Sequence, residues 1–108
     1  MPVVDRIAER TGHGPAFDVS PRGVTPRPDP ELDALLGELG DGDVPELRKR
    51  LEAERDPLAA FVWGRALVAA GTPAAAAALD AYADRIRGDD PWPGSFPGAT
   101  ELLRYLGR

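Results

Sequence analysis

Residues 56–88, DPLAAFVWGRALVAAGTPAAAAALDAYADRIRG, decide the fold of this chain. Asp-Pro opens the stretch, Gly-Thr-Pro divides it at residues 71–73, and Gly closes it at position 88. Asp and Thr side chains accept hydrogen bonds from the free N–H groups at the start of a helix, Pro fits the first helical position, and Gly commonly ends a helix. The pattern therefore predicts helices at residues 57–70 and 72–87. The short connection between them predicts an antiparallel hairpin.

The first helix of this pair is expected to lie at the centre of the fold. Arg65 is its only charged residue, so the helix is apolar almost all round, which is typical of a helix buried on several sides. Gly64 and the neighbouring alanines would let another helix approach closely. The second helix has one apolar face, which consists of Ala75, Leu79, Tyr82, Ala83 and Ile86.

The same start and stop signals recur on both sides of this hairpin. Asp29-Pro30 precedes leucines at helical spacing, and Asp43 and Glu46 have the spacing of a capping box. Glycines at positions 40 and 107 are expected to end helices. Three more helices are predicted in this way, at residues 30–39, 45–55 and 99–106.

The N-terminal part predicts a different kind of structure. Residues 11–30 are rich in Gly and Pro, which predicts an extended arm. Apolar residues before them suit one or two turns of helix. We therefore expect an all-α fold, a small bundle of four to five short helices arranged as helical hairpins. A single helical domain of residues 30–108 follows an N-terminal arm of residues 1–29.

The composition excludes several classes of function. The chain has 108 residues, a formal net charge of −5, no Cys and one His, which is His13. Without Cys it has no disulfide, no thiolate zinc site and no cysteine nucleophile. One His cannot build a multi-histidine metal site, and an acidic chain is not expected to bind nucleic acid through phosphates. We expect no metal and no cofactor.

The sequence also predicts the location of the chain in the cell. No apolar stretch reaches the ~18 residues of a membrane span. The first residues carry neither a basic leader nor a long apolar run, so we expect no secretory signal. The expectations are therefore a cytoplasmic protein and no membrane partner.

Four residues are candidates for contact with a partner or ligand. Trp92-Pro93 and Phe96-Pro97 place two aromatic side chains on a stiff segment, where they either anchor a partner or fold back onto the helical core. Arg65, among apolar residues, either pairs with an internal acid or holds an acidic partner or anion. Trp63, on the same helix as Arg65, is the fourth candidate.

No residue is assigned a catalytic role. His13 lies in a Gly-rich segment with no neighbouring group to orient it as a base. The carboxylates of Asp89 and Asp90 stand between helices, where capping and solvation explain them. Arg48-Lys49-Arg50 is the only basic run, and the glutamates around it indicate an ion-paired, solvated helix face.

These observations predict a non-enzymatic module for protein–protein interaction or regulation, or an accessory to a larger complex. Its partner is expected to be another protein or a second copy of the chain. The alternative is a helical domain that binds a small ligand or assists an enzyme, with an anion held by Arg65.

Overall fold

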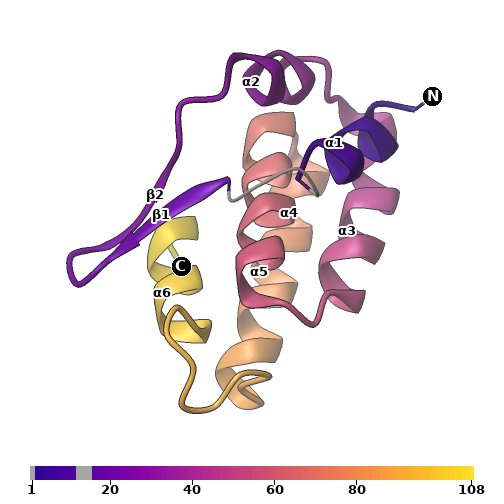
Figure 1. Ribbon diagram of the computed structural model, residues 1–108. Helices are drawn as coiled ribbons and strands as arrows, with labels where there is room; N and C mark the ends of the chain where they lie inside the picture. The colour runs from indigo at the N-terminus through magenta and orange to yellow at the C-terminus, as the bar shows by residue number, and fades with distance from the viewer. Residues whose placement is uncertain (1, 12–15) are drawn as a thin grey trace.

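A computed structural model describes residues 2–11 and 16–108 and shows a mostly helical chain with one small sheet (Figure 1). The described residues form α1 (Val3–Thr11), β1 (Phe17–Ser20), β2 (Gly23–Pro26), α2 (Pro30–Gly37), the 3-10 turn η1 (Asp41–Asp43), α3 (Val44–Ala53), α4 (Pro57–Ala70), α5 (Pro73–Gly88) and α6 (Ala99–Leu106). Over these residues, no helix combines the length and the apolar character needed to span a bilayer.

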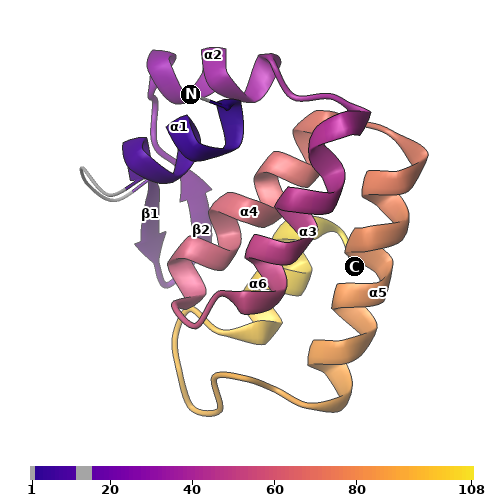
Figure 2. The same cartoon turned by 90° about the vertical axis from the view of Figure 1, so that its right-hand side faces the viewer.

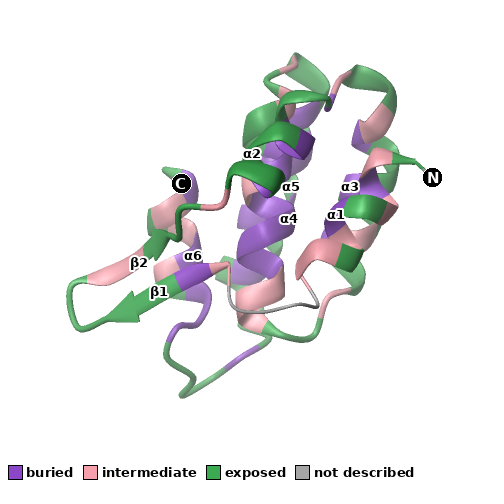
Figure 3. Cartoon of the chain, turned by 45° about the horizontal axis from the view of Figure 1, so that its top comes forward, coloured by how far each residue is buried: buried purple, intermediate pink, exposed green. Residues whose placement is uncertain are grey.

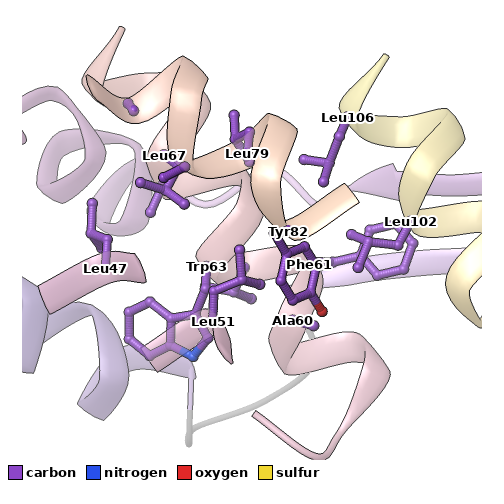
Figure 4. Close-up of a cluster of buried hydrophobic side chains, with 14 of the residues drawn as sticks. Leu47, Leu51, Ala60, Phe61, Trp63, Leu67, Leu79, Tyr82, Leu102 and Leu106 are labelled. Carbon is purple, nitrogen blue, oxygen red and sulfur yellow. The ribbon is translucent and has the colours of Figure 1, made fainter. Parts of the chain in front are cut away.

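The predicted hairpin of α4 and α5 is confirmed, and α4 is the central helix. It contacts α2, α3, α5 and α6, and its surface is buried over most of its length (Figure 3). In Figure 2, α3 crosses in front of α4 and α5 runs along the right-hand edge, and α3 and α5 also contact each other. The side chains of α4 therefore form the middle of a core to which every neighbouring helix contributes (Figure 4).

The predicted helix starts at Asp29, Asp56 and Thr72 are confirmed. Each side chain accepts a hydrogen bond from a backbone N–H of its own helix, at 3.2 Å, 3.3 Å and 3.2 Å respectively. Each is followed by Pro in the first turn. Gly71 ends α4 with φ 66° and ψ 17°, a left-handed conformation that a residue with a side chain adopts only with strain.

Two predicted helix signals are wrong, and a third, Gly88, ends its helix as expected but without the usual left-handed conformation. α2 ends at Gly37, because the N–H groups of the next two residues turn back to nearer carbonyls, and Gly40 then lies in extended conformation. Asp43 forms no capping box with Glu46, because its Oδ2 accepts the N–H of Gly40 at 3.0 Å and so closes the 3-10 turn. Gly88 is the last residue of α5 and is not left-handed.

The extended arm is not confirmed, because residues 17–26 form an antiparallel β-hairpin with a two-residue connection. Ser20 closes the turn, since its hydroxyl accepts the N–H of Arg22 at 3.2 Å. A cross-strand ion pair joins Arg27 Nε and Asp18 Oδ1 at 2.5 Å. The helix count also exceeds the expected four to five, because the N-terminal apolar residues form a full helix of nine residues, α1.

An aromatic cluster attaches this hairpin to the helices. The ring of Phe17 lies 5.5 Å from the ring of Phe61 in α4 and 5.5 Å from the ring of Tyr105 in α6, measured between centroids. The rings of Phe61 and Tyr105 are 5.4 Å apart. Burial of Phe17 among these rings fixes the start of β1. Val24 of β2 is partly buried and also packs against the core, while most of the other strand residues stay in water.

Candidate functional site

The segment between α5 and α6 separates the two aromatic candidates that the sequence paired. Trp92 is buried in the core, and its Nε1 donates a hydrogen bond to the carbonyl oxygen of Arg55 at 2.7 Å. Its backbone N–H donates to Asp90 Oδ1 at 2.8 Å. Trp92 therefore ties the segment to the junction of α3 and α4 and presents little of its side chain to a partner.

Phe96, four residues further on, points into water. It is 59% exposed, the highest value among the large hydrophobic residues of residues 2–11 and 16–108. The backbone on both sides of it is fixed, because the N–H of Ser95 donates to the Trp92 carbonyl at 3.1 Å and the Ser95 hydroxyl donates to the Pro97 carbonyl at 3.2 Å. Pro97 and Gly98 are buried. Phe96 is thus an exposed ring on an anchored loop.

Trp63, the third aromatic candidate, lies inside the fold between α3 and α4. Its Nε1 donates to Glu54 Oε1 at 3.2 Å, and the guanidinium carbon of Arg50 lies 5.4 Å from the centroid of its ring. Arg50 also pairs with Glu46 at 3.1 Å. Because every polar feature of this indole is already used within the chain, Trp63 acts here as a packing residue.

Arg65 pairs with a carboxylate of the chain. Its Nη2 donates to Asp33 Oδ1 at 2.7 Å, and this single bond joins α4 to α2. The Arg65 side chain is only 19% exposed, whereas that of Asp33 is 55% exposed. Arg65 Nη1 is buried and has no hydrogen-bond partner among the described residues. The guanidinium therefore lies mostly out of water with part of its donor capacity unused, which is an unfavourable state for a charged group.

An open depression surrounds this pair. It has a volume of about 420 Å³, and α2, α4 and α6 contribute to it. We call it the Arg65 depression. Its lining consists of Asp33, Leu36, Gly37, Arg65, Val68, Ala69 and Tyr105. In Figure 1, α2 lies across one end of α4, and α6 lies alongside α4 on the side of the molecule that carries the β-hairpin.

The Arg65 depression combines a cation with apolar surface. Val68 is 52% exposed, although it belongs to the central helix. Burial raises the pKa of the Tyr105 phenol, and the nearby charge of Arg65 acts in the opposite direction. The phenol is therefore protonated at neutral pH and can donate a hydrogen bond. A second depression, of about 210 Å³, shares Val68 with the Arg65 depression and is lined by Leu67, Val68, Gly71, Thr72, Ala76, Leu79 and Arg108.

A further depression, of about 440 Å³, lies between α1 and α2. Its two arginines already have partners in the chain. Arg6 pairs with Glu38 at 3.1 Å, and Arg10 pairs with Asp29 at 3.0 Å. It therefore offers no cation that is short of hydrogen-bond acceptors, in contrast to the Arg65 depression.

Arg65 is the only lining residue of the depression that was predicted as a site residue, and its two polar neighbours there, Asp33 and Tyr105, were not. Asp33 appears in the sequence as part of the solvated face of its helix, and Tyr105 as one residue of a short amphipathic helix. Asp33 is 32 residues away from Arg65, so no local spacing could reveal the pair. The lone charge on an otherwise apolar helix was the one signal that the sequence offered.

The sequence also drew attention to His13, to the carboxylates and to the basic run of α3. His13 lies outside the described residues. Within residues 2–11 and 16–108, no group of three or more His, Cys, Asp or Glu side chains is arranged to hold a metal ion. The basic run of α3 is ion-paired as expected, since Arg48 pairs with Glu52 at 2.9 Å. No family model, no curated protein and no solved structure matches the chain.

Proposed function

We propose that the chain is a non-enzymatic protein-interaction module of the cytoplasm, an accessory or regulatory subunit that contacts its partner through Phe96. The partner is another protein or a second copy of the chain. One observation carries the proposal: Phe96 is exposed on a loop whose flanking residues, Trp92 and Pro97, are buried.

The energetic argument concerns preorganisation. Transfer of a phenylalanine side chain from water into an interface contributes about 1.5–3 kcal/mol. If the loop were mobile, part of this free energy would be offset by the entropy lost when the loop becomes ordered on binding. The hydrogen bonds of Ser95 and of the Trp92 indole already hold the loop in one conformation. An exposed, preorganised aromatic ring is the type of residue that dominates binding energy at interfaces.

The test places a photo-reactive phenylalanine derivative at position 96, in the cells that make the protein. The matched control carries the same group at position 19, where Val19 is another exposed apolar residue. Irradiation should give one adduct of defined mass from position 96 and none from position 19.

Purified components then decide the proposal. The partner found in the adduct should bind the unchanged chain at least about tenfold more tightly than Phe96→Ala, the size of effect expected for a central interface residue. Val19→Ala should bind like the unchanged chain. Equal binding by Phe96→Ala and the unchanged chain would overturn the proposal.

A second candidate function is supported by a different observation. The unused donor capacity of Arg65, beside a depression of about 420 Å³, favours a domain that binds a small anionic ligand. The pairing of Arg65 with Asp33 weakens this candidate if that bond is permanent, and supports it if the bond exchanges with a ligand. The exposure of Asp33 favours exchange.

A further inference from the structure

We propose that the Arg65 depression binds an aliphatic carboxylate, and that Asp33 occupies the place of the ligand's carboxylate in the unliganded chain. The inference rests on the second candidate function and is independent of Phe96. It names the chemical class of the ligand and a residue of the chain that competes with it.

The Arg65–Asp33 bond has the properties of an exchangeable contact. Only one guanidinium nitrogen of Arg65 bonds to Asp33, and only one of the two carboxylate oxygens accepts. The Asp33 side chain is more than half exposed, so it can leave the guanidinium and be hydrated at little cost. Arg65 has no such freedom, because most of its side chain is buried in the depression. Removal of Asp33 alone leaves a cation that still needs an acceptor.

A ligand's carboxylate can satisfy Arg65 better than Asp33 does. A guanidinium holds a carboxylate through two parallel N–H···O bonds when the carboxylate approaches in its plane. Asp33 reaches only Nη2 from its position on α2, and Nη1 is buried without an acceptor. A carboxylate that is not tethered to α2 can accept from both nitrogens only when the departure of Asp33 gives it access to Nη1. The Tyr105 phenol, which also lines the depression, is protonated at neutral pH and can donate a further hydrogen bond.

The other residues of the depression indicate the chemical nature of the rest of the ligand. Leu36, Val68 and Ala69 provide aliphatic surface next to the cation. Gly37 leaves space, since a methyl group built at its Cα meets no other atom within 4 Å. A branched chain of a few carbon atoms would cover the exposed part of Val68, and burial of this apolar area favours binding. The volume, about 420 Å³, lies in the range of small-ligand sites, ~300–1,000 Å³.

The probe is 4-methylpentanoate, which combines a carboxylate with a branched aliphatic chain. Its control is 4-methylpentanamide, which has the same shape and no charge. Two-dimensional NMR of the whole chain should show saturable shifts of the Arg65 side-chain N–H and of the Val68 amide, with a Kd tighter than ~1 mM, which is ~4 kcal/mol of binding free energy. The amide should bind at least about tenfold more weakly, because it lacks the charge.

Two variants and one control test the competition. Asp33→Asn should bind 4-methylpentanoate about threefold to fivefold more tightly, the size of a surface ion pair's contribution. Arg65→Lys, which keeps the charge but lacks the planar fork, should bind at least about tenfold more weakly. Val19→Ala, far along the chain on β1, should bind like the unchanged protein.

The other possible results of these binding experiments either overturn the inference or support it. Equal binding of the acid and the amide, a Kd weaker than ~1 mM, or unchanged affinity in Asp33→Asn would overturn the inference. Equal binding of acetate and 4-methylpentanoate would also overturn it, because the aliphatic part would then contribute nothing, although the anion site of the second candidate function would stand. Tighter binding of N-acetyl-leucine than of the free acid would support it and identify the source as the C-terminus of a peptide chain. The reverse order would support it with a small metabolite as the source.

Discussion

Gly64 of α4 packs directly beneath Leu106 of α6, and a Cβ atom added at position 64 would lie 2.9 Å from Leu106 Cδ2. Both residues are buried, and the lack of a side chain at position 64 lets the two helices approach closely. The contact joins the central helix to the last helix of the chain. It makes the effect of a side chain at position 64 dependent on the residue at position 106.

Gly64→Ala should therefore affect stability differently in two backgrounds. Ala improves the helix propensity of α4 by about 1 kcal/mol over Gly. In the unchanged chain, displacement of the Leu106 methyl group offsets this gain. In Leu106→Ala, the new methyl group fills part of the cavity, so the gain should be larger by about 1 kcal/mol. Urea unfolding of the four chains measures this difference, and an equal effect of Gly64→Ala in both backgrounds would contradict the contact.

Gly98, at the start of α6, is expected to tolerate no side chain. A Cβ atom there would lie 2.7 Å from the backbone carbonyl oxygen of Ser95, which cannot rotate away as a side chain could. Gly98→Ala should lower the free energy of unfolding by about 1–3 kcal/mol, the range for overpacking.

Gly37→Ala is the matched control for Gly98→Ala. Gly37 is the last residue of α2, and a Cβ atom there meets nothing within 4 Å. Its replacement should leave stability unchanged or raise it by up to about 1 kcal/mol, because Ala restricts the unfolded chain. Both variants are compared by thermal unfolding, and equal losses in the two would refute the predicted steric origin.

Replacement of Trp92 should lower stability far more than replacement of Phe96. Trp92→Ala removes a buried indole and leaves the Arg55 carbonyl without its donor, so a loss of about 3–5 kcal/mol is expected. Phe96→Ala removes a side chain that mostly faces water, and should change stability by less than about 0.5 kcal/mol. Circular dichroism during urea unfolding tests both. A large loss in Phe96→Ala would place its ring in the core and remove the basis of the proposed interface.

The helices were predictable because their signals are local. Asp29, Asp56 and Thr72 each cap the helix that they precede, with a bond to an N–H group two or three residues away. The β-hairpin was not predicted, because β1 and β2 have only four residues each and β2 begins with Gly and ends with Pro. What holds it to the fold is Phe17 against Phe61 and Tyr105, and a contact between segments so far apart leaves no pattern in the sequence.

The candidate site was predictable only in part, for the same reason. A lone arginine on an apolar helix had to find either an internal acid or a ligand, and the sequence identified Arg65 on that basis. Its partner Asp33 looks like any other solvated acid of α2 until the packing of α2 on α4 is known. Likewise, Trp92 and Phe96 have similar local sequences, each before a Pro, and only the tertiary structure, in which Trp92 packs in the core and bonds to the Arg55 carbonyl, shows which of them is buried.

Asp29 should make the stability of the fold depend on acid pH. A bidentate hydrogen bond from Arg10, at 3.0 and 3.1 Å, lowers the pKa of Asp29, and the N–H of Leu32 lowers it further. The folded chain therefore favours the charged carboxylate. Its contribution is complete above the pKa of an unfolded Asp, about 3.9, and is lost as the pH falls through the lower pKa of the folded state.

Asp29→Asn isolates this pH dependence from capping. The Asn side-chain oxygen can still accept the N–H of Leu32, but it has no charge for Arg10 and does not titrate. The variant should be less stable than the unchanged chain at pH 7, and the difference should shrink as the pH falls below about 4. Urea unfolding at several pH values measures it. A difference that stays constant down to pH 2 would show that Arg10 does not stabilise the charged form.

Tyr82 should impose the opposite limit in alkaline solution. Burial raises its pKa to about 12, and the nearby Arg85 lowers it by less. The fold thus favours the protonated phenol, so between pH 10 and pH 12 the folded chain keeps a proton that the unfolded chain has lost. The stabilising contribution is complete below pH 10 and declines above it, by about 2 kcal/mol at pH 12. Tyr82→Phe should remove most of this decline without lowering stability at pH 7.

Absorbance at 295 nm provides an independent measurement, because it follows the ionisation of the phenols directly. Burial raises the pKa of Tyr105 as well, so both tyrosines of the chain should ionise above pH 10 while it is folded. If either phenol of the folded chain titrated near pH 10, as free tyrosine does, its burial against the central helix would be refuted.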